Sequence, residues 1–192
     1  MKDEKISKTL SFILRHDAQK RNMKISSDGF VSLDELLEQK EFLGITANDI
    51  QRVVFENDKQ RYTIKEINKN LFVRANQGHS MDLQVEMDRI FTPITAIHGT
   101  KLSSWKHIQK TGLCRMTRKH IHFASGLNAM SGFRKNSECL IYLDMHKALQ
   151  DGIEFYKSSN GVILSEGVNG KLDPKYFLRV EFKDSSKSFK LP

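Results

Sequence analysis

The first residues of the chain show the repeat of an amphipathic helix. The apolar positions are Ile6, Leu10, Ile13 and Leu14. This spacing places them on one face of a helix, so the pattern predicts a helix over about residues 5–17. Arg15 and His16 follow the last apolar position and are expected where this helix ends.

Two capping signals predict the next helices. Ser32 stands three residues before Glu35, and Thr46 stands three residues before Asp49. A hydroxyl and a carboxylate at this spacing form a capping box at a helix N-terminus. Both pairs stand among apolar residues at helical spacing, so each is expected to begin a helix.

A short β-hairpin is predicted after these helices. Two β-rich runs, at residues 61–65 and 71–74, flank the polar turn Asn68-Lys69-Asn70. The order of helix, short strand, two helices and hairpin is that of a winged helix, a helix-turn-helix variant often found on nucleic acids. The same fold can be a protein-interaction module, because a fold does not fix a function.

From about residue 94 the chain favours β-structure. Strands are expected at residues 94–97, 121–124, 139–143, 153–156, 162–164 and 177–182. One helix is expected from a cap at Ser103 or Ser104 to Gly112, and another over residues 145–149. This pattern predicts an α+β lobe with antiparallel or mixed sheets.

The chain is long enough for one large domain or two small lobes, and we favour two lobes. We place a winged-helix lobe in residues 1–90 and the α+β lobe in residues 91–192, with connector-like sequence within residues 76–93. Of the 192 residues, 39% are hydrophobic and 28% are charged, which is typical of a globular protein.

Several classes of protein are disfavoured by the composition. No apolar run approaches the roughly 20 residues of a membrane span, and Met1-Lys2-Asp3-Glu4 lacks the order of a signal peptide. We therefore expect a cytoplasmic protein. We also expect it to be a monomer. Cys114 and Cys139 form no CxxC pair, so neither a disulfide framework nor a zinc site is predicted.

The net charge of +8 lies in the second part of the chain. Residues 1–89 contain 15 Lys and Arg against 15 Asp and Glu, whereas residues 90–192 contain 16 against 8. This excess suits a polyanionic partner, although it also helps to keep a protein soluble. The charge alone does not distinguish a protein that binds a polyanion from one whose basic surface keeps it soluble, so sequence motifs are needed.

Arginines recur at the ends of predicted elements and in loops. Arg15 closes the first helix, Arg74 closes a strand before a polar segment that runs to Ser80, and Arg134 follows Gly132-Phe133. Each alone is an ordinary surface arginine. Because the planar guanidinium matches phosphate oxygens, we expect the three arginines to converge on one phosphate.

Histidines and a glycine mark a second candidate site. His98-Gly99-Thr100 follows the predicted strand at residues 94–97, where a ligand can approach the main chain. His120 and His122 alternate with apolar residues and should face one side of a strand. No third ligand stands at a suitable spacing, so no metal site is predicted. The sequence also has neither a GxGxxG motif nor a Walker loop.

Several short segments together resemble the NAD-dependent RNA 2'-phosphotransferases. They are Ser7-Lys8-Thr9-Leu10-Ser11, Leu14-Arg15-His16, Asn57-Asp58-Lys59-Gln60-Arg61-Tyr62, Arg74-Ala75-Asn76-Gln77-Gly78-His79-Ser80, His98-Gly99-Thr100, His120-Ile121-His122, Ser131-Gly132-Phe133-Arg134 and Asn160-Gly161-Val162-Ile163-Leu164. Each segment is a weak signal by itself. The ordered set, over about residues 6–180, is specific.

The resemblance implies a winged-helix lobe that engages RNA and an ADP-ribosyltransferase-like lobe that holds NAD. It implies that an internal RNA 2'-phosphate, left when tRNA halves are ligated by one route, attacks the anomeric carbon of the nicotinamide ribose and expels nicotinamide. The ribose 2''-hydroxyl of this RNA-2'-phospho-ADP-ribose then attacks the phosphorus. The products are 2'-OH RNA and ADP-ribose 1'',2''-cyclic phosphate.

The resemblance also implies roles for individual residues. The catalytic set is Arg15, His16, Arg74 and Arg134. The NAD contacts are His98, Gly99, Thr100, His122, Asn160 and Val162. The RNA contacts are Lys59, Arg61, Gln77 and His79. Many ADP-ribosyltransferases that modify proteins carry a glutamate in place of Val162, but an anionic phosphate nucleophile needs no such base.

Three other functions compete with this interpretation. An enzyme that ADP-ribosylates terminal phosphates of RNA or DNA would stop after the first step, so its products would differ. A catalytically silent nucleic-acid-binding module is disfavoured by the presence of Arg15, His16, Arg74 and Arg134. A metal hydrolase lacks a set of ligands.

Overall fold

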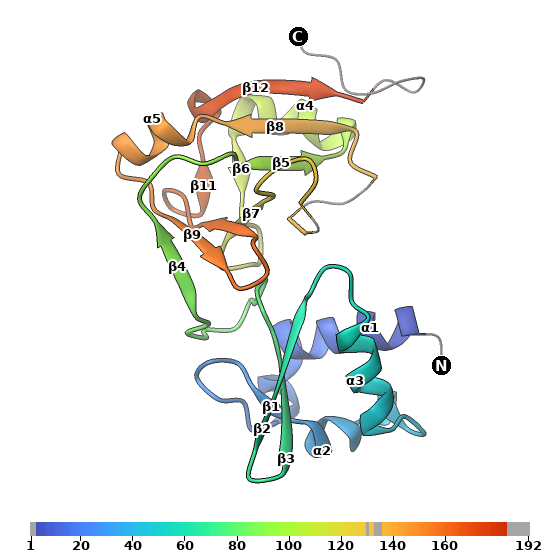
Figure 1. The fold of residues 1–192 in the computed structure, drawn as a ribbon. Coiled ribbons are helices and arrows are strands. Elements are labelled where there is room, and N and C mark those ends of the chain that lie inside the picture. The colour runs from blue at the N-terminus through green and yellow to red at the C-terminus, as the bar shows by residue number, and fades with distance from the viewer. Residues whose placement is uncertain (1–2, 130, 133–135, 184–192) are drawn as a thin grey trace. The chain divides into compact units, whose positions relative to one another are not determined.

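The computed structural model describes residues 3–129, 131–132 and 136–183. The chain divides into two compact units, Met1–Glu86 and Met87–Pro192 (Figure 1). Strand β4 (Met87–Ile90) lies in the stretch that resembled a connector. It belongs to the second unit because it pairs along its whole length with β9 (Phe155–Ser158).

The first unit consists of three α-helices and a small sheet. Its α-helices and strands are α1 (Asp3–Phe12), β1 (Val31–Ser32), α2 (Leu33–Leu37), α3 (Ala47–Phe55), β2 (Tyr62–Ile67) and β3 (Asn70–Ala75). Short 3-10 helices occupy Gln19–Arg21 and Lys40–Phe42. This is the element order that the sequence predicts.

The first helix changes its winding before it ends. The α-helix covers Asp3–Phe12, and Ile13–Asp17 form a π-helical turn in which the amide of Ala18 donates to the carbonyl of Ile13 at 2.9 Å. The predicted apolar stripe is buried throughout. Such π-turns are wider than α-turns and often occur at functional sites.

The strands of the first unit form an antiparallel sheet in the order β1-β3-β2. The β2–β3 hairpin turns at Asn68 and Lys69, both of which have positive φ angles, of 50° and 64°. Two residues of this conformation make a type I′ turn, which matches the twist of a hairpin. The register runs from Tyr62 opposite Ala75 to Ile67 opposite Asn70.

The helices cover one face of this sheet. Side chains from α1, the π-turn, α2, α3 and the hairpin form a single apolar core; among them are Leu10, Leu14, Leu36, Ile50 and Val73. Every second side chain of the hairpin strands packs in this core, because successive side chains of a strand point to opposite faces of the sheet. The intervening side chains of β2 and β3 therefore lie on the opposite face.

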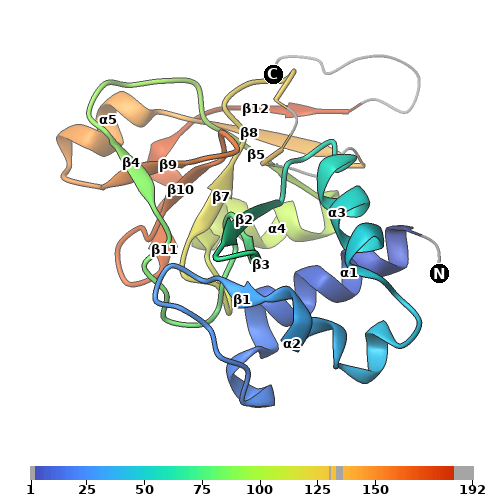
Figure 2. The same ribbon diagram turned by 60° about the horizontal axis from the view of Figure 1, so that its bottom comes forward.

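The second unit contains most of the strands. Its elements are β4, β5 (Ile97–Thr100), α4 (Leu102–Thr111), β6 (Leu113–Cys114), β7 (Ile121–Phe123), β8 (Cys139–Leu143), α5 (Met145–Gln150), β9, β10 (Ile163–Ser165), β11 (Lys171–Leu172) and β12 (Phe177–Phe182). The larger sheets have the orders β4-β9-β10-β7 and β12-β8-β5 (Figure 2). Strands β11 and β6 form a separate two-stranded sheet. Every paired strand in the described residues is antiparallel. The predicted α+β class is confirmed.

The two larger sheets share one apolar core. Phe123, Ile141, Phe155 and Ile163 come from four different strands and are all buried in it. Ile97 and Ala124 exchange backbone hydrogen bonds of 2.8 and 2.9 Å, which join the sheets at one point.

Strand β5 is displaced from its predicted position. The sequence favoured residues 94–97, but the strand covers Ile97–Thr100 and includes the His98-Gly99-Thr100 triplet. Pairing with β8, from Ile97 opposite Tyr142 to Thr100 opposite Cys139, accounts for the difference. Tertiary pairing overrides the weak strand preference of glycine.

Two predicted helix caps are wrong. Ser32 stands at the N-cap of α2 but makes no side-chain cap hydrogen bond. The Glu35 carboxylate, which would accept the Ser32 amide in a capping box, accepts the amide of Lys24 at 2.9 Å. Helix α4 begins at Leu102, not after Ser103 or Ser104, and the Glu138 carboxylate accepts the Leu102 amide at 3.0 Å. Glu138 thus takes the place of a local cap.

The predicted capping box at Thr46 and Asp49 is confirmed. The Thr46 hydroxyl accepts the Asp49 amide at 3.3 Å, and the Asp49 carboxylate accepts the Thr46 amide at 2.9 Å.

In the part of the chain that the structure describes, no helix is both long and apolar enough to span a membrane.

We predict that Thr46→Ala lowers the free energy of unfolding by about 1 kcal/mol, because a cap hydrogen bond at the start of α3 is lost. Urea titration followed by far-ultraviolet circular dichroism measures this change. Ser32→Ala is the matched control, since Ser32 makes no such bond, and it should change stability by less than about 0.5 kcal/mol. Equal losses in both variants would contradict the assignment.

Candidate functional site

The end of the first helix contacts the polar segment that follows β3. The Ser80 amide donates to the carbonyl of Arg15 at 3.0 Å, and Nδ1 of His16 lies 3.0 Å from the Ser80 hydroxyl. Arg15 and His16 lie in the π-turn. The structure therefore brings together two of the candidate segments, which are about 60 residues apart in the sequence.

The segment passes beside Arg15 at Gly78, whose positive φ angle favours glycine. Its φ angle is +88°, and a Cβ atom built at Gly78 would lie 3.5 Å from Nε of Arg15. The backbone thus runs directly beside the guanidinium. His79 is buried and faces Gly29, where a Cβ atom would lie 3.7 Å from its Nε2.

Arg74 is a buried cation on β3, with 8% of its surface exposed. Its Nη1 donates to the carbonyl of Asp28 at 3.3 Å, and its guanidinium carbon lies 4.8 Å from the centre of the Phe30 ring. Its Nε is buried and finds no hydrogen-bond acceptor among the described residues. Because a buried charge is stable only with partners, this guanidinium is suited to bind an anion.

Asp28 and Phe30 are site residues that the sequence analysis missed. The Asp28 carboxylate lies 3.3 Å from Nζ of Lys65 and 4.0 Å from Nη1 of Arg74. A hydrogen bond from the Ser26 hydroxyl, and then the Lys65 ammonium, hold the pKa of Asp28 below its usual range. No local sequence signal indicates that Asp28 faces β3.

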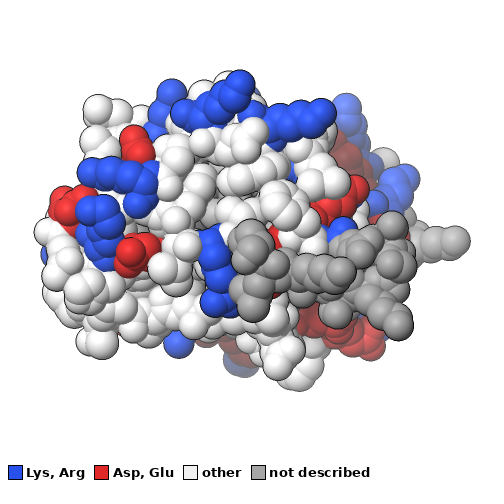
Figure 3. Space-filling model, turned by 90° about the horizontal axis from the view of Figure 1, so that it is seen from above, with Lys and Arg blue, Asp and Glu red and all other residues white. Residues whose placement is uncertain are grey.

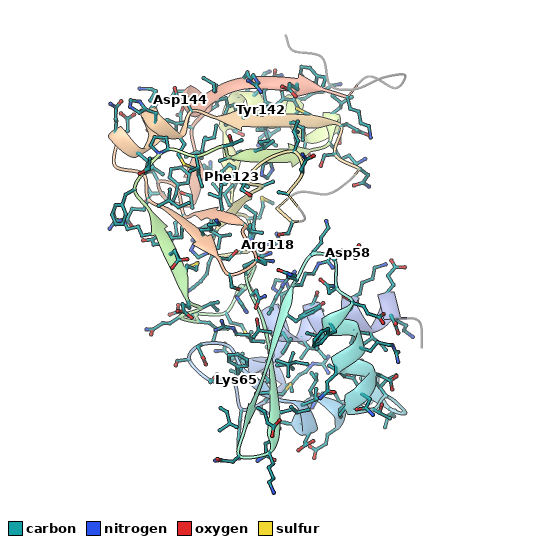
Figure 4. The ribbon with its side chains drawn as sticks, in the orientation of Figure 1. Asp58, Lys65, Arg118, Phe123, Tyr142 and Asp144 are labelled. Carbon is teal, nitrogen blue, oxygen red and sulfur yellow. The ribbon has the colours of Figure 1, made fainter. Side chains whose placement is uncertain are left out.

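Lys59 and Arg61 lie in the connection between α3 and β2, before the hairpin, which turns at Asn68 and Lys69. Asn57 orders this connection, since its side-chain oxygen accepts both the amide of Arg61 at 3.1 Å and its Nη1 at 3.3 Å. Figure 4 shows Asp58 in the same connection.

Gln77 and His79 belong to the segment that contacts Arg15, next to Gly78. Of the candidate residues in the first unit, Arg15, His16, Gln77 and His79 therefore gather around one segment. Arg74 stands at the start of that segment, at the end of β3.

His98 and His122 are joined in the second unit. Nδ1 of His98 lies 2.9 Å from the carbonyl oxygen of His122, and the His98 ring meets that of Phe123 edge-on at 6.0 Å. Burial lowers the pKa of His98, and the bond to His122 offsets only part of this effect. A carbonyl oxygen can only accept, so Nδ1 carries a proton, and the lowered pKa favours the neutral imidazole, in which Nε2 is an acceptor.

Asn160 and Val162 lie in the turn that joins β9 to β10. The Asn160 side-chain oxygen accepts from the Ser158 hydroxyl at 2.8 Å, and its carbonyl accepts from the Ser131 hydroxyl at 3.1 Å. Val162 is fully buried. The bond from Ser131 fixes the start of the Ser131-Gly132 segment against this turn.

Gly132 packs against the backbone of Ala124. Its φ angle is +113°, and a Cβ atom there would lie 2.4 Å from the Cα of Ala124. Only glycine allows so close an approach. Arg134, the remaining candidate of the catalytic set, lies outside the described residues.

Charged side chains are unevenly spread over the surface. On the face seen in Figure 3, Lys and Arg gather along one edge, and much of the middle of the face carries no charge.

His120 lies 3.9 Å from the Glu166 carboxylate, and burial lowers the pKa of its imidazole. In the described part of the chain, no three His, Cys, Asp or Glu side chains cluster as metal ligands.

Comparison with known proteins gives consistent matches over nearly the whole chain. Residues 1–167 match the family described as RNA 2'-phosphotransferase, Tpt1 / KptA family. A Schizosaccharomyces pombe protein named "Putative tRNA 2'-phosphotransferase" is 47% identical over 186 residues, covering 93% of this chain and 51% of that protein. This chain therefore spans about half the length of that relative.

Two other relatives match over most of their own length. The Danio rerio protein named "tRNA 2'-phosphotransferase 1" is 40% identical over 193 residues, covering 94% of this chain and 86% of that protein. The Saccharomyces cerevisiae protein named "tRNA 2'-phosphotransferase" is 34% identical over 203 residues, covering 97% of this chain and 88% of that protein.

We predict that Gly132→Ala destabilises the protein by roughly 2 to 6 kcal/mol, the sum of backbone strain and overpacking against Ala124. Thermal melting measures the loss. Gly126→Ala is the matched control, because a Cβ atom at Gly126 meets nothing within 4 Å; it should stay within about 0.5 kcal/mol of wild type. Wild-type melting of Gly132→Ala would show that the contact with Ala124 is absent in solution.

A second prediction concerns pH. The pKa of His98 is lowered in the folded protein, whereas a histidine in an unfolded chain titrates near about 6.5. Protonation then favours the unfolded state, so stability should fall as the pH is lowered through about 6.5. His98→Gln should reduce the stability lost between pH 8 and pH 5.5, as measured by urea unfolding. The same change at exposed His107 should preserve the full loss, and an undiminished loss in His98→Gln would contradict the prediction.

Proposed function

The chain belongs to the RNA 2'-phosphotransferase family, and from this premise we propose that it removes an internal 2'-phosphate from RNA with NAD as a consumed co-substrate. The relatives named as tRNA 2'-phosphotransferases support a tRNA-like substrate. The observation that carries the proposal is the buried guanidinium of Arg74, whose Nε has no hydrogen-bond acceptor among the described residues. Arg74 also begins the short segment whose Gly78 lies beside Arg15.

The proposed reaction consists of two substitutions. The RNA 2'-phosphate oxygen forms a bond to the anomeric carbon of the nicotinamide ribose, and the bond from that carbon to nicotinamide breaks. The ribose 2''-hydroxyl then loses its proton and bonds to phosphorus, and the RNA 2'-oxygen leaves and is protonated. RNA with a 2'-hydroxyl, ADP-ribose 1'',2''-cyclic phosphate and nicotinamide result.

In this proposal the first unit acts as a winged-helix lobe that binds RNA. Support comes from its element order and its type I′ hairpin. Arg15 and Arg74 bind and align the phosphate, and they stabilise the charge on its oxygens during both substitutions. His16 donates a hydrogen bond to the phosphate or transfers a proton in the second step. Arg134 is proposed as the third guanidinium.

The second unit is proposed to be an ADP-ribosyltransferase-like lobe that holds NAD. His98 offers a neutral acceptor, Nε2, to a nucleotide hydroxyl or amine, and Gly99 offers its main chain at the edge strand β5. Thr100, whose carbonyl accepts the Glu138 amide at 2.8 Å, is a further proposed contact. The further proposed contacts are His122, Asn160 and Val162. The apolar side chain of Val162 fits an anionic nucleophile, which a carboxylate would repel.

The direct test is to incubate the protein with an RNA that bears one internal 2'-phosphate, with and without NAD. We expect 2'-OH RNA, nicotinamide and ADP-ribose 1'',2''-cyclic phosphate, identified by mass spectrometry, only when NAD is present. Release of inorganic phosphate without NAD would overturn the proposal. An end product in which ADP-ribose stays attached to RNA would favour phosphate ADP-ribosylation instead.

We predict that Arg74→Lys lowers the single-turnover rate roughly a hundredfold to a thousandfold, the usual cost of losing one donor to a transition state. A lysine keeps the charge but not the two-pronged geometry of the guanidinium. Arg52→Lys is the matched control, because Arg52 is an exposed arginine on α3 that pairs with Asp3 and Asp49. Retention of the wild-type rate in a folded Arg74→Lys protein would remove Arg74 from the catalytic set.

A further inference from the structure

The first unit contains a hollow that none of the proposed roles explains. Its volume is about 310 Å³, and it is lined by Lys24, Ile25, Ser26, Phe30, Lys65, Ile67 and Phe72. The size is at the lower end of small-ligand pockets. It lies on the hairpin and on the segment that leads into β1.

The strand register places this hollow on the sheet face away from the core. Ile64 and Val73 pair with each other and pack on the apolar core, whereas the next pair, Lys65 and Phe72, must point to the opposite face. Figure 4 shows Lys65 on the side of the hairpin turned away from α3. Arg74 follows Phe72 by two residues and therefore lies on the same face.

The hollow joins an apolar floor to a cationic edge. Phe72 and Ile67 are not among the described residues that form the core, and 45% of the Ile67 surface is exposed. Nζ of Lys65 lies 3.7 Å above the Phe30 ring, and exposed Lys24 stands at the rim. Apolar side chains beside two lysines suit a ligand that is flat and apolar at one end and anionic at the other.

The Phe30 ring connects the hollow to Arg74. It lines the hollow, and the guanidinium carbon of Arg74 lies 4.8 Å from its centre. Among the described residues, the Asp28 carboxylate pairs with both Lys65 and Arg74. The Glu35 carboxylate accepts the amide of Lys24, so with Lys24 included three cations stand beside two carboxylates, and the surroundings of the hollow keep a net positive charge.

We propose that this hollow binds one nucleobase of the RNA, next to the nucleotide whose 2'-phosphate is held at Arg74. The inference rests on the proposed function and extends it to a base subsite. Single-stranded RNA is commonly held by stacking its bases on aromatic side chains while cations contact its phosphates. Phe72 supplies the aromatic surface, and Lys24 and Lys65 supply the charges. An acidic peptide would also pair with the lysines, but Arg74, proposed to hold the RNA 2'-phosphate, contacts the same Phe30 ring and favours a base of that RNA.

The test measures binding of the full chain to short single-stranded RNAs without NAD, so that no turnover occurs. Each RNA is fluorescently labelled and carries one internal 2'-phosphate, and a series replaces each neighbouring base in turn by an abasic nucleotide. Fluorescence anisotropy gives Kd for the wild type and for Phe72→Ala. If a base occupies the hollow, one abasic position next to the 2'-phosphate should weaken wild-type binding by roughly fivefold to 150-fold.

The decisive result is the coupling between protein and RNA. Phe72→Ala should weaken binding of the complete RNA by a similar factor and should lose sensitivity to that one abasic position. Phe55→Ala is the matched control, since Phe55 is 93% exposed at the end of α3 and does not line the hollow; it should keep the wild-type pattern. Equal abasic effects in wild type and Phe72→Ala, or no RNA binding by wild type, would overturn the proposal.

A second measurement tests the lysines. Lys65→Gln should reduce the slope of log Kd against log salt concentration by roughly 0.7, the value for one contact with a single-strand phosphate. Lys40→Gln, at an exposed lysine outside the hollow, should leave the slope unchanged. An unchanged slope in Lys65→Gln would remove this lysine from the subsite.

The same RNAs separate failure of the subsite from failure of the proposed function. Wild-type removal of the 2'-phosphate without any coupling at Phe72 would overturn the subsite alone. Coupling at Phe72 without 2'-phosphate removal in the presence of NAD would support the base subsite and would overturn the proposed reaction.

Discussion

The pairing of β2 with β3 is the constraint on which the first unit depends. The two-residue turn at Asn68 and Lys69 sets the register, and the register decides which side chains of β3 face the core. Val73 packs among the apolar side chains, while Arg74 lies on the other face beside Phe30. A slip of one residue would exchange these faces and place the guanidinium in the core, where it would have no partner.

In both units, segments without regular structure are held by contacts that involve the main chain. The Ser80 amide bonds to the carbonyl of Arg15, and Gly132 lies against the backbone of Ala124. Such contacts do not depend on long flexible side chains, so they can position a loop at a low cost in side-chain entropy. They also place strict demands on residue type, since Gly132 has no room for a Cβ atom.

Much of the local structure follows from the sequence. The apolar stripe of the first helix is buried, the turn between the two hairpin strands is where the polar residues predict it, and the predicted strands 139–143 and 177–182 match β8 and β12. These features depend on periodicity or on residues close in sequence. The capping box of Thr46 and Asp49 is of the same kind, because its two residues are only three positions apart.

The sequence by itself determined the helix and hairpin order of the first unit, the α+β character of the second, and the ordered motifs that indicate the family. Only the tertiary structure decided that Glu138 caps α4, that β5 includes Gly99, and that Asp28 and Phe30 surround Arg74. The partners in these contacts lie far apart in the chain. Their meeting depends on how whole elements pack, and no local pattern of residues records that packing.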